Sequence, residues 1–116
     1  MSQLNVNIYE TADAVVIRLE GEAGIRAADG LQVPLQRITG ARPALVIFDM
    51  TELQVVASLF LGLLVNFRRG LVAQGSRIQM AGVRPNIREL FQVTRLEELF
   101  EFVSAAPPSP NAATVV

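Results

Sequence analysis

The 116-residue sequence contains no cysteine and no histidine. Without cysteine, disulfides, thiolate catalysis and cysteine-based metal sites are excluded, and without histidine the commonest general base and metal ligand are missing. Charged residues make up 18% of the chain, the formal net charge is -1 and no block of basic residues stands out. A surface for nucleic acid therefore has little electrostatic support. We expect no catalytic residues, no metal, no cofactor and no nucleic-acid partner.

Long hydrophobic runs are also missing. No stretch reaches the roughly 18 to 20 apolar residues of a membrane span, and the N-terminus, Met-Ser-Gln-Leu-Asn-Val, lacks the cationic and apolar segments of a signal peptide. We therefore expect a cytoplasmic protein that does not insert into the membrane. Hydrophobic residues nevertheless make up 51% of the chain, which is enough to bury the core of one domain.

The hydrophobic pattern predicts strands that alternate with helices. Residues 4–9 alternate apolar and polar, as in a strand with one exposed face, whereas residues 44–50 form an apolar run typical of a strand covered on both faces. Further strands are predicted at 14–21, 77–83 and 99–103, and helices at 27–38, 58–73 and 86–93. Pro34 should kink or delay the first helix, and Asp49 is expected to end its strand and cap a turn.

This order of elements predicts an α/β fold, in which a mixed sheet of four to five strands packs against three to four helices. Right-handed crossovers would place the strand-to-helix junctions along one edge of the sheet. From residue 105 the sequence Ala-Ala-Pro-Pro-Ser-Pro-Asn-Ala-Ala has neither periodicity nor bulk. We therefore predict a domain over residues 1–104 and a disordered tail over 105–116.

The junction between the apolar strand and the helix that follows it has an unusual composition. Its sequence, Ala57-Ser58-Leu59-Phe60, is apolar where a reactive loop would be polar. Besides the helix's core stripe, Phe60, Leu63 and Phe67 form a second apolar stripe at i, i+3 and i+7. If the second stripe is exposed, it is a contact surface for a partner. If the helix is deeply buried, the stripe belongs to the core, and both interpretations stay open.

Three local strings, in this order, resemble the STAS domains of bacterial anti-sigma-factor antagonists. They are 17–22, which ends in Gly-Glu like the family's second strand, 45–64, and 75–91, which is similar to the family's strand, turn and helix. The resemblance covers about residues 4–103. It implies a STAS-like sheet and a non-catalytic protein-interaction module that acts in signalling and transcription regulation.

The resemblance also gives the apolar junction a meaning. In the family this junction reads Asp-Ser-Ser-Gly, followed by an aliphatic residue and Gly, and a partner kinase phosphorylates the second serine. Counting forward from Asp49 without a gap, Ala57 takes the Asp place, Ser58 the place of the first serine and Leu59 that of the phosphoacceptor. Phe60 takes the glycine place, and Gly62 matches. The resemblance therefore implies a contact that phosphorylation does not switch.

Ser58 allows two interpretations. A shift of one residue would make it a phosphorylation site, because free amides and the macrodipole favour a phosphate at a helix N-terminus. The simpler interpretation is that Ser58 is the N-cap of the helix, since both of its neighbours are apolar and offer a kinase no polar recognition loop.

The first functional hypothesis is a docking module that binds through residues 57–73. The implied partners are a kinase-like anti-sigma factor, a larger signalling complex, a transporter subunit or a second copy of the chain. The partner-binding residues would be Ala57, Ser58, Leu59, Phe60, Gly62, Leu63 and Phe67. The second hypothesis is a regulatory domain in which the apolar junction lines a pocket for a small hydrophobic ligand.

Overall fold

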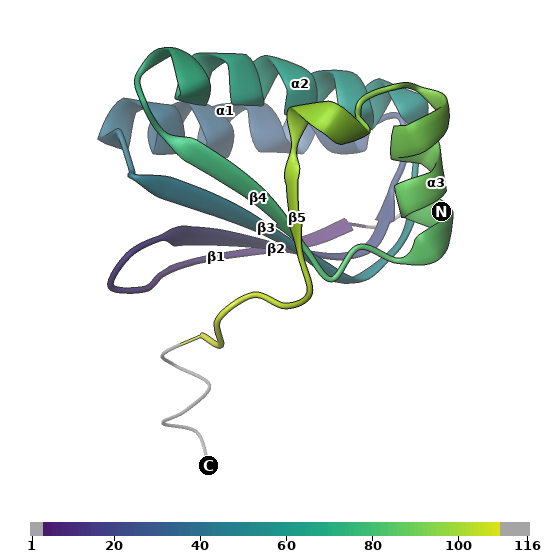
Figure 1. Cartoon of the computed structure of the whole chain (residues 1–116), viewed down its shortest axis with the longest axis horizontal. Coiled ribbons are helices and arrows are strands. Elements are labelled where there is room, and N and C mark those ends of the chain that lie inside the picture. Colours follow the sequence, from purple (N-terminus) through teal and green to yellow (C-terminus); the bar gives the residue numbers. More distant parts are fainter. Residues whose placement is uncertain (1–3, 110–116) are drawn as a thin grey trace.

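The computed structural model describes residues 4–109, and these residues form an α/β fold (Figure 1). Strands and helices alternate after an initial pair of strands. In chain order the elements are β1 (Leu4–Glu10), β2 (Val15–Ala23), α1 (Ala27–Ala41), β3 (Leu45–Val56), α2 (Ser58–Ala73), β4 (Arg77–Ala81), α3 (Pro85–Val93), the short 3-10 helix η1 (Glu97–Leu99) and β5 (Glu101–Val103). The predicted α/β fold with a mixed sheet and three helices is therefore confirmed.

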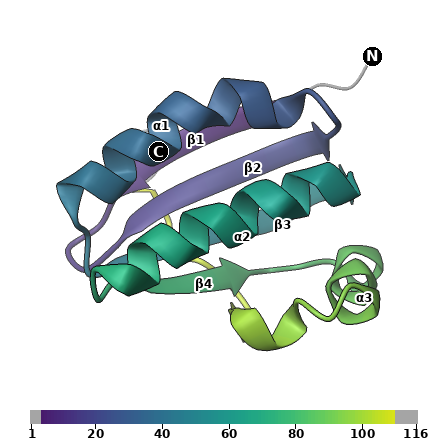
Figure 2. The ribbon, with the colours of Figure 1, turned by 90° about the horizontal axis from the view of Figure 1, so that it is seen from above.

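The five strands form one sheet in the order β1-β2-β3-β4-β5. β1 pairs with β2 in antiparallel fashion, and the other pairs are parallel. Helices α1 and α2 lie side by side along one face of the sheet, and α3 lies near the end where the parallel strands finish (Figure 2). One end of the sheet therefore contains the C-terminal ends of β2 and β3 together with the starts of α1 and α2.

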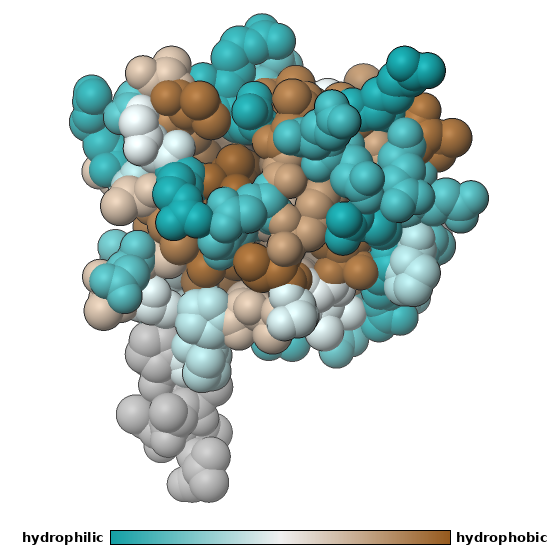
Figure 3. All heavy atoms as spheres, viewed as in Figure 1, coloured by the Kyte–Doolittle hydropathy of each residue, from teal (hydrophilic) through white to brown (hydrophobic). Residues whose placement is uncertain are grey.

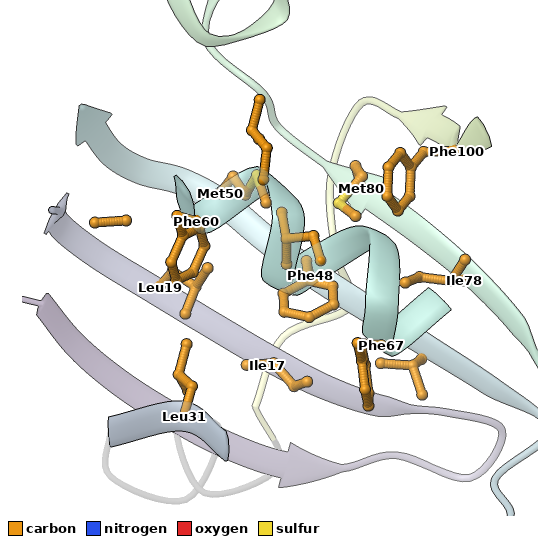
Figure 4. Close-up of a cluster of buried hydrophobic side chains, with 14 of the residues drawn as sticks. Ile17, Leu19, Leu31, Phe48, Met50, Phe60, Phe67, Ile78, Met80 and Phe100 are labelled. Atoms are coloured by element: carbon orange, nitrogen blue, oxygen red, sulfur yellow. The ribbon is translucent and has the colours of Figure 1, made fainter. Parts of the chain in front are cut away.

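The main core fills the space between the sheet and the helices (Figure 4). Phe48 of β3 lies at its centre and makes an edge-to-face contact with Phe67 of α2, with ring centroids 5.7 Å apart. Figure 4 shows Phe60 of α2 pointing between the sheet and α1, towards Leu19 and Leu31. Phe48, Leu19 and Phe60 are each fully buried, so the aromatic residues of α2 help to hold the two layers together.

The opposite face of the sheet carries a smaller cluster of buried residues: Ala14, Val16, Ile47 and Ala81. The segment after β5 leaves the sheet on this side (Figure 1), and Ala106 packs against the cluster. The Tyr9 hydroxyl donates a hydrogen bond to the Pro107 carbonyl at 2.7 Å. The predicted tail, 105–116, thus begins as an irregular segment that touches the sheet, and residues 110–116 lie outside the described part.

Helix α1 is longer than expected, because it continues through Pro34 to Ala41. A proline inside a helix costs about 3 kcal/mol through a lost hydrogen bond and a clash with the preceding turn. Leu31, Leu35 and Ile38 are buried against the sheet, and each buried side chain of this size contributes about 1.5 to 3 kcal/mol. Packing therefore outweighs the local penalty.

The expected ends of two strands were also wrong. β3 extends to Val56, well beyond Asp49, because its second half pairs with the end of β2. Asp49 lies inside the strand, where its carboxylate accepts hydrogen bonds from the Thr51 amide at 3.1 Å and the Thr51 hydroxyl at 2.7 Å. The predicted strand 99–103 begins as the turn η1, so β5 keeps three residues.

A close approach between Gly82 and Thr51 gives the first testable prediction. Gly82 follows β4 with φ +65°, and a Cβ atom at this position would overlap the Thr51 hydroxyl oxygen and lie 3.2 Å from the Thr51 Cα. Because Thr51 is held by Asp49, Gly82→Ala should lower the free energy of unfolding by about 2 to 4 kcal/mol, as measured by urea denaturation.

Gly40→Ala is the matched control, since nothing lies within 4 Å of a Cβ atom at this helical position. We expect it to be neutral or to stabilise the protein by up to about 1 kcal/mol. Equal stabilities of the two variants would show that the backbone at Gly82 does not depend on glycine.

Candidate functional site

The candidate site is the junction between β3 and α2, which contains a single residue outside both elements. Val56 ends β3, Ala57 connects, and Ser58 begins α2. The Ala57 amide donates to the Ala23 carbonyl of β2 at 2.8 Å, and the Phe60 amide donates to the Ala57 carbonyl at 2.9 Å. The junction is thus tied to the end of β2 on one side and to the first turn of α2 on the other.

Ser58 is not the N-cap that the sequence suggested. Ala57 holds the cap position with extended backbone angles, φ -79° and ψ 147°, and no side chain caps the helix. Ser58 is the first helical residue and is exposed. The Phe60 amide is bonded to the Ala57 carbonyl, but no capping side chain satisfies the earlier backbone N–H groups of α2.

The predicted partner-binding residues fall into two groups. Ser58, Leu59 and Gly62 are exposed, with Leu59 60% accessible, while Ala57 and Leu63 are half-buried. Phe60 is fully buried and Phe67 is 7% exposed. The exposed-stripe interpretation is therefore corrected for these two phenylalanines, because α1 covers the side of α2 that the sheet leaves open. The surface available to a partner is smaller and centres on Leu59.

Two exposed apolar residues near the junction were missed. Ile25 follows the end of β2 and is 69% exposed, and Val55 lies near the end of β3 and is 52% exposed. Both belong to segments that meet Ala57, since Val56 pairs with Ala23 and the Ala57 amide bonds to the Ala23 carbonyl. We name Ile25, Val55 and Leu59 the junction patch. The only signal in the sequence was an isolated isoleucine between Gly24 and Arg26.

The start of α3 fixes the extended part of β3. The Arg84 Nε donates to the Thr51 carbonyl at 3.1 Å, and the Asn86 side-chain amide donates to the Gln54 carbonyl at 3.0 Å. Arg84 also lies 3.7 Å from the Glu52 carboxylate, although this exposed pair contributes little stability. These contacts replace the β4 pairing, which stops at Asp49, so they hold the strand that leads to the junction.

The carboxylates near the junction have structural partners rather than a common ligand. Asp49 is bonded to Thr51 and Glu52 lies beside Arg84. Over residues 4–109, no group of three Asp or Glu side chains is placed to hold a metal ion. None of the helices described is long and apolar enough to cross a membrane.

A groove of about 630 Å³ separates α1 from α2. Leu35, Leu63 and Phe67 supply its apolar lining, and Gln36 and Asn66 are among its polar residues. It begins beside the junction at Leu63 rather than at Leu59. A small hydrophobic molecule would therefore find its space between the helices and not in the apolar junction itself.

These features define an α/β domain with helices on one face of the sheet and a rigid strand-to-helix junction as its candidate site. The family model of the STAS domain matches residues 5–109. The chain therefore belongs to the STAS domain family. A comparison with curated protein sequences gave no match.

Solved structures of anti-sigma factor antagonists share this fold. An anti-sigma factor antagonist from Mycobacterium paratuberculosis matches with a TM-score of 0.78 and 18% identity, covering 98% of this chain and 94% of that one. Unphosphorylated SpoIIAA, an anti-sigma factor antagonist, matches with a TM-score of 0.70 and 23% identity over 95% and 93% of the two chains. A STAS domain protein from Planctomyces limnophilus gives 0.73 and 19% over 95% and 94%.

The different burial of two neighbouring residues gives the second prediction. Phe60→Asp should unfold the domain, because it removes a fully buried ring and places a charge in the core, a loss of more than about 4 kcal/mol. Leu59→Asp should keep the stability within about 1 kcal/mol or raise it, because an exposed acid in the first helical turn is favourable. Urea denaturation followed by circular dichroism measures both, and a folded Phe60→Asp variant would contradict the assignment of Phe60 to the core.

Proposed function

We propose that this STAS domain is a non-catalytic interaction module of the anti-sigma-factor-antagonist type. It docks onto a protein partner through the β3–α2 junction, with Leu59 at the centre and Ala57, Ser58, Gly62 and Leu63 around it. The observation that carries the proposal is the exposure of Leu59, 60%, at the first turn of a helix whose start is fixed by hydrogen bonds. An exposed apolar side chain on a rigid support is suited to partner binding, because little entropy is lost on docking.

The proposed partner is an anti-sigma factor of the kinase-like type. Two solved structures with this fold bear the name of an anti-sigma factor antagonist and are similar to this chain over nearly their whole length. A further one, SpoIIAA from Bacillus, is described in its phosphorylated form. The fold and the location of the exposed surface support a similar mode of action here.

We further propose that phosphorylation does not switch the contact. In the ungapped alignment of the junction, Leu59 stands where the family has its phosphoacceptor serine, and an isobutyl group cannot accept a phosphate. A phosphate at this position would add about two negative charges to an apolar contact and would disrupt it by desolvation and repulsion. With leucine in place the contact is constitutive.

A kinase assay provides the third prediction. Incubated with ATP and a kinase of the anti-sigma type, the natural chain should keep its mass, whereas Leu59→Ser should gain one phosphate by mass spectrometry. The serine variant restores the hydroxyl at the family's acceptor place without touching the core, because Leu59 is exposed. Stoichiometric phosphate on Ser58 of the natural chain would show that the acceptor has moved by one residue and that the contact is switched.

A pull-down from the native host provides the fourth prediction. Leu59→Asp should reduce the recovery of the partner by at least about tenfold, because a charge in the centre of an apolar contact is desolvated without a counter-charge. Val93→Asp is the matched control, since Val93 is 72% exposed and lies on α3. Equal loss with both variants would contradict docking at the junction.

The groove between α1 and α2 supports a second candidate function, the binding of a small hydrophobic molecule. Its apolar lining by Leu35, Leu63 and Phe67 and its volume of about 630 Å³ are the observations that favour it. Native mass spectrometry after gentle purification distinguishes the two functions, because a bound molecule adds its mass to the chain whereas a docking module carries none.

A further inference from the structure

The first strand leaves one edge of the sheet open. β1 pairs with β2 over all seven of its residues, without a bulge, and no described element covers its other side. Proteins usually protect such edges with lysine, proline, bulges or very short strands. β1 has none of these, and its only charged residue is Glu10 at the end. Its backbone groups are therefore available to another strand.

Apolar side chains accompany this open edge. Val6 and Ile8 are 36% and 43% exposed and belong to the face of the sheet that carries the helices. This follows from the register, which pairs Val6 with the buried Leu19 and Ile8 with the buried Ile17. A strand added beside β1 would cover part of the exposed surface of both side chains.

We propose that β1 pairs with β1 of a second copy of this chain, antiparallel and about a twofold axis at Asn7. A twofold axis at any residue of β1 keeps the side chains on their proper faces, and the registers with the axis at residue 6, 7 or 8 pair the most residues. An axis at Ile8 would leave Leu4 and Asn5 without partners among the residues of β1, and an axis at Val6 would leave Tyr9 and Glu10 without partners. Only the axis at Asn7 pairs all seven residues.

In this register the strand is complementary to itself. Val6 lies opposite Ile8 of the second copy on the helix side, while Asn5 faces Tyr9 and Asn7 faces its own equivalent on the other side. Cross-strand apolar pairs of this kind contribute about 0.2 to 1 kcal/mol each. No like charges oppose each other along the strand. The second copy is thus favoured over a partner of different sequence.

Charges at the ends of the strand support the same arrangement. Arg26, at the start of α1, lines a depression of about 360 Å³ together with Leu4 and Val6. The register brings Glu10 of the second copy opposite Leu4, and hence near Arg26. The ion pairs found within residues 4–109 involve neither Arg26 nor Glu10, so both are available for this contact.

The opposite edge of the sheet cannot provide the same pairing. β5 has three residues, and its Glu101 is occupied by Arg77 at 2.8 Å and by Gln79 at 2.9 Å. On this side of the molecule hydrophilic side chains are scattered among hydrophobic ones (Figure 3). Pairing of β1 with β5 of the next chain, which would lead to filaments, is therefore disfavoured, and the twofold contact closes after two copies.

The experiment measures association of the natural chain by sedimentation equilibrium from low micromolar to submillimolar concentration. We expect a monomer–dimer equilibrium in the micromolar range, because seven residues of strand form a small interface. Asn7→Lys should weaken the dimer at least about tenfold, since two lysines then face each other at the axis. A monomer over the whole concentration range would overturn the proposal. The open edge of β1 would then be available to an extended segment of another protein.

Asn66→Lys is the matched control, because it adds the same charge at an exposed position of α2. The dimer should be unaffected. A dimer lost in Asn66→Lys and kept in Asn7→Lys would mean that the helices form the interface, and the β1 proposal would be wrong. Unchanged thermal melts of both variants establish that they fold.

A cysteine scan tests the register directly, since the natural sequence has no cysteine. Residues opposite each other have Cα atoms about 4.5 to 5.5 Å apart, within the range of a disulfide. Asn7→Cys should therefore give a covalent dimer on mild oxidation. Asn5→Cys should not, because its two copies would lie about 14 Å apart along the strands. Cross-linking at residue 5 but not at residue 7 would overturn the register.

Discussion

The structure depends on the pairing of β3 with β2 over almost its full length. β3 has twelve residues and pairs with β4 only through its first five, from Leu45 to Asp49. The rest continues beside β2 to the pair of Val56 with Ala23, and the Ala57 amide adds one more bond to the Ala23 carbonyl. Because the chain turns into α2 only there, the position of the helix and of Leu59 is set by strand pairing and not by a loop.

This dependence explains how far the sequence could predict the fold. The apolar run before Asp49 and the bounds of α2 have strong local signals, and the predictions of both held. The extension of β3 has none, since the polar residues Thr51 and Glu52 lie in it, and it is held by pairing with β2 and by hydrogen bonds from the start of α3. Likewise, the sequence of α2 shows a second apolar stripe but does not show which neighbouring element covers it. The burial of Phe60 depends on α1. Because of Pro34, the sequence predicted a shorter and kinked helix here, over residues 27–38.

The candidate site shows the same limit. Leu59 could be singled out from the sequence, because the resemblance to the family places it where the phosphoacceptor would stand, in an apolar junction. Val55 and Ile25 could not, since the segments that carry them meet at Ala57 only through the pairing of β2 with β3. The junction patch is thus a product of the tertiary structure, made from three segments of which each looks ordinary alone.

The proposed dimer and the proposed docking surface do not compete for the same residues. β1 is the edge of the sheet, whereas the junction lies at the C-terminal ends of β2 and β3. A twofold axis at Asn7 reverses the strand direction between the copies, so the two junctions point to opposite ends of one continuous sheet, with both helical layers on the same face. Each junction then has room for its own partner molecule. A partner that is itself a dimer would bind both junctions with avidity, because the second contact is made within the same complex.

The composition restricts how such a contact can be regulated. The basic side chains are all arginines, and the chain has no histidine, the side chain whose charge ordinarily changes near neutral pH. Burial raises the pKa of Tyr9, and hydrogen bonds from Arg88 and Arg77 lower the pKa of Glu97 and Glu101 respectively, so all three pKa values move further from neutral pH. The sequence has no thiol to oxidise, no imidazole to protonate and no lysine to acetylate, so these three routes of control are not open to the proposed contact. In the proposed function Leu59 takes the place of the family's phosphoacceptor, and the proposed dimer would dissociate on dilution. The concentration of the protein is then a variable that can control the contact.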